Sequence, residues 1–152
     1  MAIGPSHPVW SRLYNTLAQL AEECGGSFAF VLDEGNGLWC VGIPGREPTT
    51  FTNDQNEAAD RFYAKEIVPR MSSMRRGQPL TIASPAFEGD DRYLGVTFAG
   101  IYAVVVWFDG EFAPAIVRAR VRRALPEIEK LTLALPPSGG PGADAGAKKM
   151  RA

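Results

Sequence analysis

The sequence predicts an α/β domain of the α+β type, with helices on the faces of a five-stranded antiparallel sheet. Two observations lead to this prediction. Apolar residues recur at helical spacing in three stretches, residues 10–21, 58–67 and 117–131. Five short apolar runs, bounded by turns rich in Gly, Asn and Asp, have the character of β-strands. Along the chain the order is helix, two strands, helix, three strands and helix.

Length and composition fit a single globular domain and exclude several classes of function. The chain has 152 residues, 45% of them hydrophobic and 22% charged, enough to build a core. Its net charge of -1 argues against a nucleic-acid-binding protein, which would carry a clear excess of Lys and Arg. No apolar run approaches the roughly 18 residues of a membrane span, and no signal peptide is evident. We therefore expect a cytoplasmic protein without membrane insertion.

The first predicted elements are a helix and a β-hairpin. Pro8 suits the first turn of the helix, and Gly25 with Gly26 is a stop signal. Residues 27–33 are apolar on both alternating faces, which is typical of a central strand. A turn rich in Gly and Asn then leads into a return strand at residues 38–43. The apolar side of the helix consists of Trp10, Leu13, Leu17, Leu20 and Ala21.

A second helix is predicted to begin at Asn53 or Asp54. Glu57 lies three residues beyond Asp54, the spacing of a capping box. Pro69 is expected to end the helix because proline cannot continue the backbone hydrogen bonds. Residues 72–78 then form a basic loop. The apolar side of this helix consists of Ala58, Ala59, Phe62, Tyr63 and Ile67.

Three more strands are predicted after the basic loop. The first, residues 80–87, contains Pro85, which confines it to an edge or an irregular place in the sheet. Residues 93–98 form the next strand. Residues 102–108 are apolar on both faces, so this strand belongs in the centre of the sheet.

The arginine-rich stretch at residues 117–131 fits either a strand or a helix by its periodicity. A strand would have one long, strongly charged face, whereas a helix aligns five apolar positions, so we predict a helix. Asp109 or Glu111 can favour its N-terminus, and Pro126 is expected to kink or split it. The five aligned positions are Val117, Val121, Ala124, Ile128 and Leu131.

The C-terminal stretch differs from the rest of the chain. Residues 136–152 are rich in Pro, Gly and Ala, with no aromatic and no branched aliphatic side chain. Such a segment cannot bury enough apolar surface to offset its conformational entropy. The sequence therefore predicts a folded domain at residues 1–135 and a disordered tail at residues 136–152.

Residues with catalytic potential are sparse. His7 is the only histidine and precedes the first helix, which makes a His-based catalytic or metal site improbable. Cys24 and Cys40 fall at core-facing or near-core positions, where free cysteine is usually a small hydrophobic residue. Neither a P-loop nor a dinucleotide-binding glycine motif is present. We expect an interaction module with no catalytic residue, no metal and no cofactor.

Two stretches, "LAQLAEECGGSFAFVLDEGNGLWCVG" and "YAVVVWFDGEFAPAIVRARVRRALPEIEKL", resemble the roadblock (dynein light chain) family. They are similar in particular to the bacterial MglB-like regulators of small Ras-like GTPases. The resemblance covers about residues 9–133. Two features depart from the family pattern: Pro126 in a helix that is normally continuous, and Trp39 with Cys40 in place of smaller residues. The resemblance implies a roadblock/profilin-like three-layer fold with strand order 2-1-5-4-3, two helices on one face and one on the other.

The resemblance also implies a homodimer that binds a small Ras-like GTPase. The third strand and second helix would meet their symmetry mates, and the outer side of the helix pair would contact the GTPase. The implied dimer residues are Phe62, Tyr63, Ile67, Ile82 and Ser84. The implied partner-binding residues are Asp60, Arg61, Ala64, Lys65, Arg75 and Arg76, with Lys148, Lys149 and Arg151 of the tail contacting an acidic partner surface.

The function that the resemblance implies is a non-catalytic regulator or scaffold that modulates the cycle or location of a GTPase, with bacterial motility and cell polarity as candidate processes. MglB-like dimers reshape the GTPase without an arginine finger, so the arginines are interpreted as contacts. One alternative is a roadblock-type assembly subunit without effect on hydrolysis. Another is a small-molecule sensor of related topology, which the apolar character of the predicted core disfavours. Activation, nucleotide exchange and scaffolding all remain open.

Overall fold

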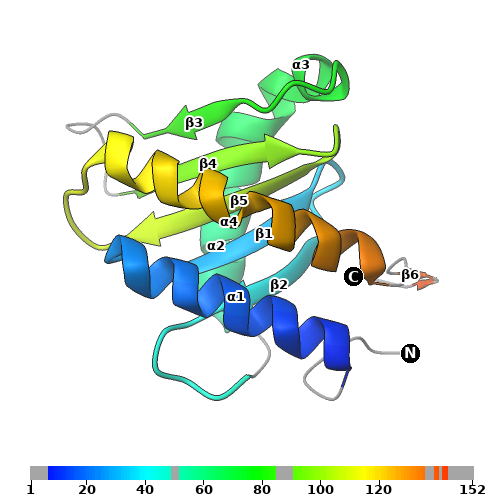
Figure 1. Cartoon of the computed structure of the whole chain (residues 1–152). Helices are drawn as coiled ribbons and strands as arrows, with labels where there is room; N and C mark the ends of the chain where they lie inside the picture. The colour runs from blue at the N-terminus through cyan, green and yellow to red at the C-terminus, as the bar shows by residue number, and fades with distance from the viewer. Residues whose placement is uncertain (1–6, 49–51, 85–90, 136–138, 141, 144–152) are drawn as a thin grey trace.

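The computed structural model describes residues 7–48, 52–84, 91–135, 139–140 and 142–143. The domain has three layers: α1 and α4 cover one face of a five-stranded sheet, and α2 crosses the other face (Figure 1). The strand order is β2-β1-β5-β4-β3, and every neighbouring pair is antiparallel. The predicted fold class and strand order are confirmed.

The N-terminal helix and hairpin follow the sequence prediction closely. Helix α1 spans Pro8–Cys24, and the strands are β1 (Phe28–Asp33) and β2 (Leu38–Gly42). The helix begins at His7, whose Nδ1 accepts a hydrogen bond from the backbone N–H of Val9 at 3.2 Å. It ends at Gly25, which adopts a left-handed conformation with φ of 74°. His7 is therefore a capping residue.

Close packing of α1 on β2 depends on one glycine. A Cβ atom at Gly42 would lie 2.3 Å from the backbone nitrogen of Ala18, far inside van der Waals contact. Only glycine allows the helix backbone to approach the strand this closely.

The second helical region is longer than predicted and irregular. It consists of α2 (Asn53–Phe62), a π-helical turn η1 (Tyr63–Ile67), a 3₁₀ turn η2 (Val68–Arg70) and α3 (Met71–Arg75). Two predictions at its far end were therefore wrong. Pro69 does not end the helical region, because it lies in the first turn of η2, where its missing N–H is not needed. The predicted basic loop at residues 72–78 is largely helical, since α3 occupies its first half.

The start of this region also differs from the prediction. Thr52, rather than Asn53 or Asp54, is the N-cap residue. The Gln55 side-chain oxygen accepts hydrogen bonds from the backbone N–H of Thr52 at 2.7 Å and from its hydroxyl at 2.6 Å. The capping box therefore pairs Thr52 with Gln55, and Glu57 is not part of it.

The remaining strands are β3 (Thr81–Ala83), β4 (Arg92–Phe98) and β5 (Tyr102–Phe108). As predicted, β5 is central, and β3 is an edge strand. β3 is shorter than the predicted residues 80–87, of which residues 85–87 lie outside the described part of the chain. The turn between β4 and β5 contains Ala99 and Gly100, with φ values of 55° and 81°.

Helix α4 spans Pro114–Ala134, and its buried side is the predicted one. It begins at Pro114 with Ala113 as N-cap, so neither Asp109 nor Glu111 caps it, contrary to expectation. Pro126 does not split α4: the helix is continuous through it, with buried apolar side chains anchoring the helix on both sides of the proline. Beyond α4, two-residue strands β6 (Gly139–Gly140) and β7 (Gly142–Ala143) pair with each other.

Two apolar cores lie on opposite faces of the sheet. One joins α1 and α4 to the sheet, and the other joins α2 and the following turns to the opposite face. Gly95 in β4 makes room for the second core, because a Cβ atom there would lie 3.1 Å from the Phe62 ring and 3.2 Å from Val105. Among the described helices, none is long and apolar enough to cross a membrane.

Candidate partner-binding surface

The solvent side of α2 and η1 carries four of the residues that the sequence places in a partner-binding surface. Asp60, Arg61, Ala64 and Lys65 are all exposed. Val68, one turn further, is also exposed at 50%, and it is one of the few large apolar side chains in the described chain with this exposure. We call Ala64, Lys65 and Val68 the helix crest. It is a small apolar surface beside a positive charge.

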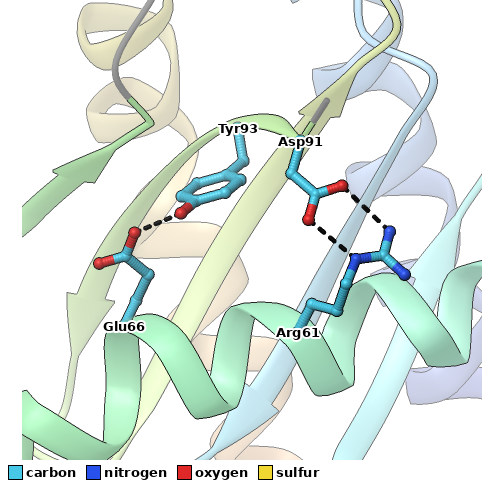
Figure 2. Close-up of polar contacts among 4 residues, drawn as sticks. All are labelled: Arg61, Glu66, Asp91 and Tyr93. Carbon is cyan, nitrogen blue, oxygen red and sulfur yellow. Dashed lines mark hydrogen bonds and ion pairs between the residues drawn. The ribbon is translucent and has the colours of Figure 1, made fainter. Parts of the chain in front are cut away.

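One flank of the crest is tied to the beginning of β4. Arg61 donates two hydrogen bonds to the Asp91 carboxylate, from Nε at 2.8 Å and from Nη2 at 3.1 Å (Figure 2). The guanidinium carbon also lies 5.9 Å from the centre of the Trp107 ring. The hydrogen bond to Asp91 raises the pKa of Arg61. Arg61 is therefore held in one orientation by its own chain.

A second contact on this flank is buried. Figure 2 shows the Tyr93 hydroxyl donating a hydrogen bond to the Glu66 carboxylate. Arg70 completes the arrangement, because its Nη1 donates to the Glu66 carboxylate at 2.8 Å and to the Glu66 backbone carbonyl at 3.0 Å. Burial and the bond to Glu66 raise the pKa of Tyr93. Both oxygens of this buried carboxylate thus have donors, as a stable buried charge requires.

The opposite flank is tied to the turn between β1 and β2. Asn36 donates to the Asp60 carboxylate at 3.2 Å, and the Tyr63 hydroxyl donates to the Glu34 backbone carbonyl at 2.9 Å. Arg75 donates from Nε to the Glu34 carboxylate at 2.8 Å, which raises the pKa of Arg75. The second helical region is therefore fastened on both flanks, and the crest between them is held at a fixed position.

These contacts separate the predicted partner-binding residues into two groups. Arg61 and Arg75 each share their charge with a carboxylate of the same chain, and Asp60 accepts a hydrogen bond. Ala64, Lys65 and Arg76 are exposed, and their side chains make no hydrogen bond or ion pair with the described residues. The side chains of the second group are therefore free of ion pairs within the described chain, whereas any new contact with Arg61 or Arg75 would compete with an existing ion pair.

The π-helical turn determines which side chains of this region are buried. Phe62 and Ile67, five residues apart, are both fully buried, and Glu66 between them is buried as well. A regular α-helix places residues three or four apart on one side, whereas a π turn places residues about five apart there. Ala64 and Lys65, which lie within this turn, both face the solvent. Such turns occur frequently at functional sites.

Most of the residues assigned to a dimer interface are already covered within one chain. Phe62 and Ile67 are 0% exposed, and Ile82 and Ser84 are also buried. The Phe62 ring contacts Phe30 and Tyr93 edge-on, at centroid distances of 6.3 Å and 5.1 Å. These side chains belong to the inner core in a single chain. Thr81 and Ala83 of β3 itself are exposed, so a second copy could reach them.

Other candidates from the sequence lie away from this surface. Cys40 is buried and burial raises the pKa of its thiol; the pKa of Cys24 is raised for the same reason. Within the described residues, no group of three or more His, Cys, Asp or Glu side chains could hold a metal ion. The tail residues Lys148, Lys149 and Arg151 lie outside the described part of the chain.

Comparison with solved structures finds chains of the same fold. MglB from Myxococcus xanthus has a TM-score of 0.58 at 15% identity, covering 83% of this chain and 98% of that chain. The gliding protein MglB from Thermus thermophilus has a TM-score of 0.55 at 16% identity, covering 88% and 100%. An MglB structure with a tetrameric arrangement gives 0.54 at 16% identity, with the same coverage.

The sequence comparisons give no further assignment, because no protein-family model and no curated protein matches the chain. The structural similarity extends over nearly the whole length of the MglB chains, and the strand order agrees with the order expected for a roadblock-type domain. The chain thus has the MglB-like roadblock fold.

Proposed function

We propose that this protein is a non-catalytic homodimer that binds a small Ras-like GTPase and modulates its nucleotide cycle or its location. The observation that supports this proposal is the similarity to MglB over 83–88% of the chain. The structure adds a surface suited to such a partner. The helix crest presents Ala64 and Val68 beside Lys65, and both flanks hold it in place before any partner arrives.

A rigid crest favours binding because little conformational entropy is lost when a partner docks. Ala64 matters most, since a small side chain on an exposed helix allows another surface to approach closely. In a twofold dimer the two crests are repeated around one axis, so that a single GTPase can contact both copies. In this proposal the arginines contact the GTPase and do not act as catalytic groups.

The Ala64→Arg variant tests this surface. We expect it to abolish the capture of a GTP-loaded small Ras-like GTPase from the same organism, because the long charged side chain prevents close approach. Circular dichroism and the molar mass should not change, since Ala64 is exposed. The matched control is Ala119→Arg, an exposed alanine on α4, which should bind normally.

The outcomes of this experiment distinguish the functions. Binding that depends on GTP and is lost in Ala64→Arg supports a regulator acting through the crest. Equal binding by Ala64→Arg would place the docking surface elsewhere. Binding to both nucleotide states with unchanged hydrolysis would instead indicate an assembly subunit.

We also propose self-association through the edge of β3. Within the described chain β3 pairs only with β4, so its other edge is open to a second strand. An open strand edge is a liability unless it is covered. Light scattering at micromolar concentration should therefore give twice the 16.4 kDa of one chain. A mass of one chain would contradict this prediction.

A further inference from the structure

A recess lies between the β1–β2 turn, the β4–β5 turn and the end of α4. It has a volume of about 560 Å³ and does not include any residue of the helix crest. Its walls are mainly apolar, with Trp39, Ile101 and Leu133 among them, and Leu133 is 57% exposed. We call it the terminal pocket, because Leu135, the residue that follows α4, lies on its rim.

Thr132 provides a first indication that the terminal pocket takes a ligand. This side chain lines the pocket and is only 1% exposed. Its hydroxyl has no hydrogen-bond partner within the described residues, and it is the one buried side-chain oxygen or nitrogen there of which this is true. An unsatisfied buried hydroxyl is destabilising, so a ligand that supplies a partner gains affinity.

The charge of Asp33 is a second indication that the terminal pocket takes a ligand. Its carboxylate accepts hydrogen bonds from the backbone N–H groups of Gly35 and Gly37 and from Trp39 Nε1, each at 2.8 Å. All three donors are neutral, and within the described residues no cation pairs with Asp33. The negative charge therefore stays uncompensated on the wall of an apolar pocket. It is close enough to Tyr102 to contribute, with burial, to the raised pKa of that residue.

Together these features define the chemistry of a ligand. It carries a positive charge for Asp33, an apolar part for Trp39 and Leu133, and a polar backbone or side-chain group for Thr132. The Trp39 ring, which meets Tyr102 edge-on at 5.6 Å, also favours a cation or a thioether sulfur. A basic peptide that contains methionine has all of these groups.

The chain itself contains such a peptide. Residues 148–151 read Lys-Lys-Met-Arg, and they are joined to the pocket rim by residues 136–147, a segment rich in Gly, Pro and Ala. Twelve residues can span at most about 40 Å, so the basic segment is within reach of the pocket at a roughly millimolar effective concentration. We propose that the terminal pocket binds residues 148–151 of the same molecule, which then become unavailable to a partner.

Nuclear magnetic resonance of the full chain tests this proposal. The variant Lys148→Glu/Lys149→Glu should shift the amide resonances of Gly35, Ile101 and Leu133, because the basic segment leaves the pocket. The matched control Arg118→Glu/Arg123→Glu makes the same charge change on exposed positions of α4 and should leave these resonances in place. Leu133→Arg tests the other side of the contact: it should move the Met150 resonance to its position in a free peptide of residues 146–152.

Three results decide the proposal. The proposal is supported if the pocket resonances shift in the lysine variant, the shift does not depend on protein concentration, and addition of the peptide of residues 146–152 reverses it. Unchanged pocket resonances in the lysine variant would overturn it. Shifts that grow with protein concentration would also overturn it, since the basic segment would then occupy the pocket of another molecule. None of these measurements requires a GTPase, so the result is separate from the outcome for the helix crest.

Discussion

Replacing Phe62 with aspartate is expected to unfold most of the protein. Phe62 is fully buried between α2 and the sheet, where its ring contacts Phe30 and Tyr93, and Gly95 leaves the space that it occupies. The substitution removes a large aromatic side chain and buries a carboxylate without a partner. We expect a loss of about 4 kcal/mol or more in the free energy of unfolding. That is a large part of the roughly 5–15 kcal/mol of a typical domain.

Urea denaturation followed by circular dichroism measures this loss. The control is Lys65→Asp, which introduces the same acidic residue at an exposed position of the adjoining turn and should change the stability by about 0.5 kcal/mol or less. If the Phe62→Asp protein keeps its stability but becomes monomeric, the result would contradict the conclusion that Phe62 stabilises the core of a single chain. It would instead support the dimer contact that the family resemblance implies for this residue.

Removing the carboxylate of Glu66 is expected to have the second largest effect. In Glu66→Ala the Tyr93 hydroxyl loses its acceptor in a buried position, and Arg70 loses its ion-pair partner. Because Arg70 is partly exposed, its charge is resolvated, so the main cost is the unpaired hydroxyl. We expect a loss of about 2 kcal/mol in the free energy of unfolding.

A double-mutant cycle with Tyr93→Phe isolates this hydrogen bond. The double variant should be less destabilised than the sum of the two single variants, because neither partner is then left unpaired. Lys65→Ala, at the neighbouring exposed position, is the matched control and should be nearly neutral. Strictly additive losses would show that the bond between Glu66 and Tyr93 does not stabilise the fold.

The elements that could be predicted from sequence are those with strong local patterns. The apolar runs of β1 and β5 identified the centre of the sheet, and the spacing of Val117, Val121, Ile128 and Leu131 identified the buried side of α4. The π turn could not be predicted, since it arises from how Phe62 and Ile67 both reach the core across one irregular turn. Pro69 was wrongly taken as a helix end because it lies in the first turn of η2, where its missing N–H is not needed.

The candidate site was predicted only in part. Helical spacing correctly placed Asp60, Arg61, Ala64 and Lys65 on the solvent side. The pairs that fix Arg61 and Arg75 join residues 30 and 41 positions apart, so no local pattern reveals them. Glu66 was missed because a glutamate on an amphipathic helix is ordinarily solvent-exposed; the buried hydroxyl that binds it comes from a distant strand.

The π turn has a consequence for how this chain tolerates insertions and deletions. Deleting one residue from Tyr63–Ile67 would allow a regular α-helix, which is the more favourable backbone for an isolated segment. Residues that stand five apart across the turn would then stand four apart, which is the spacing that keeps them on one side of an α-helix. Phe62 and Ile67 would both stay in the core, and the position lost would be one of those that face the solvent, such as Ala64 or Lys65. We therefore expect deletion of Ala64 or Lys65 to keep the fold and to shorten the exposed surface of this segment.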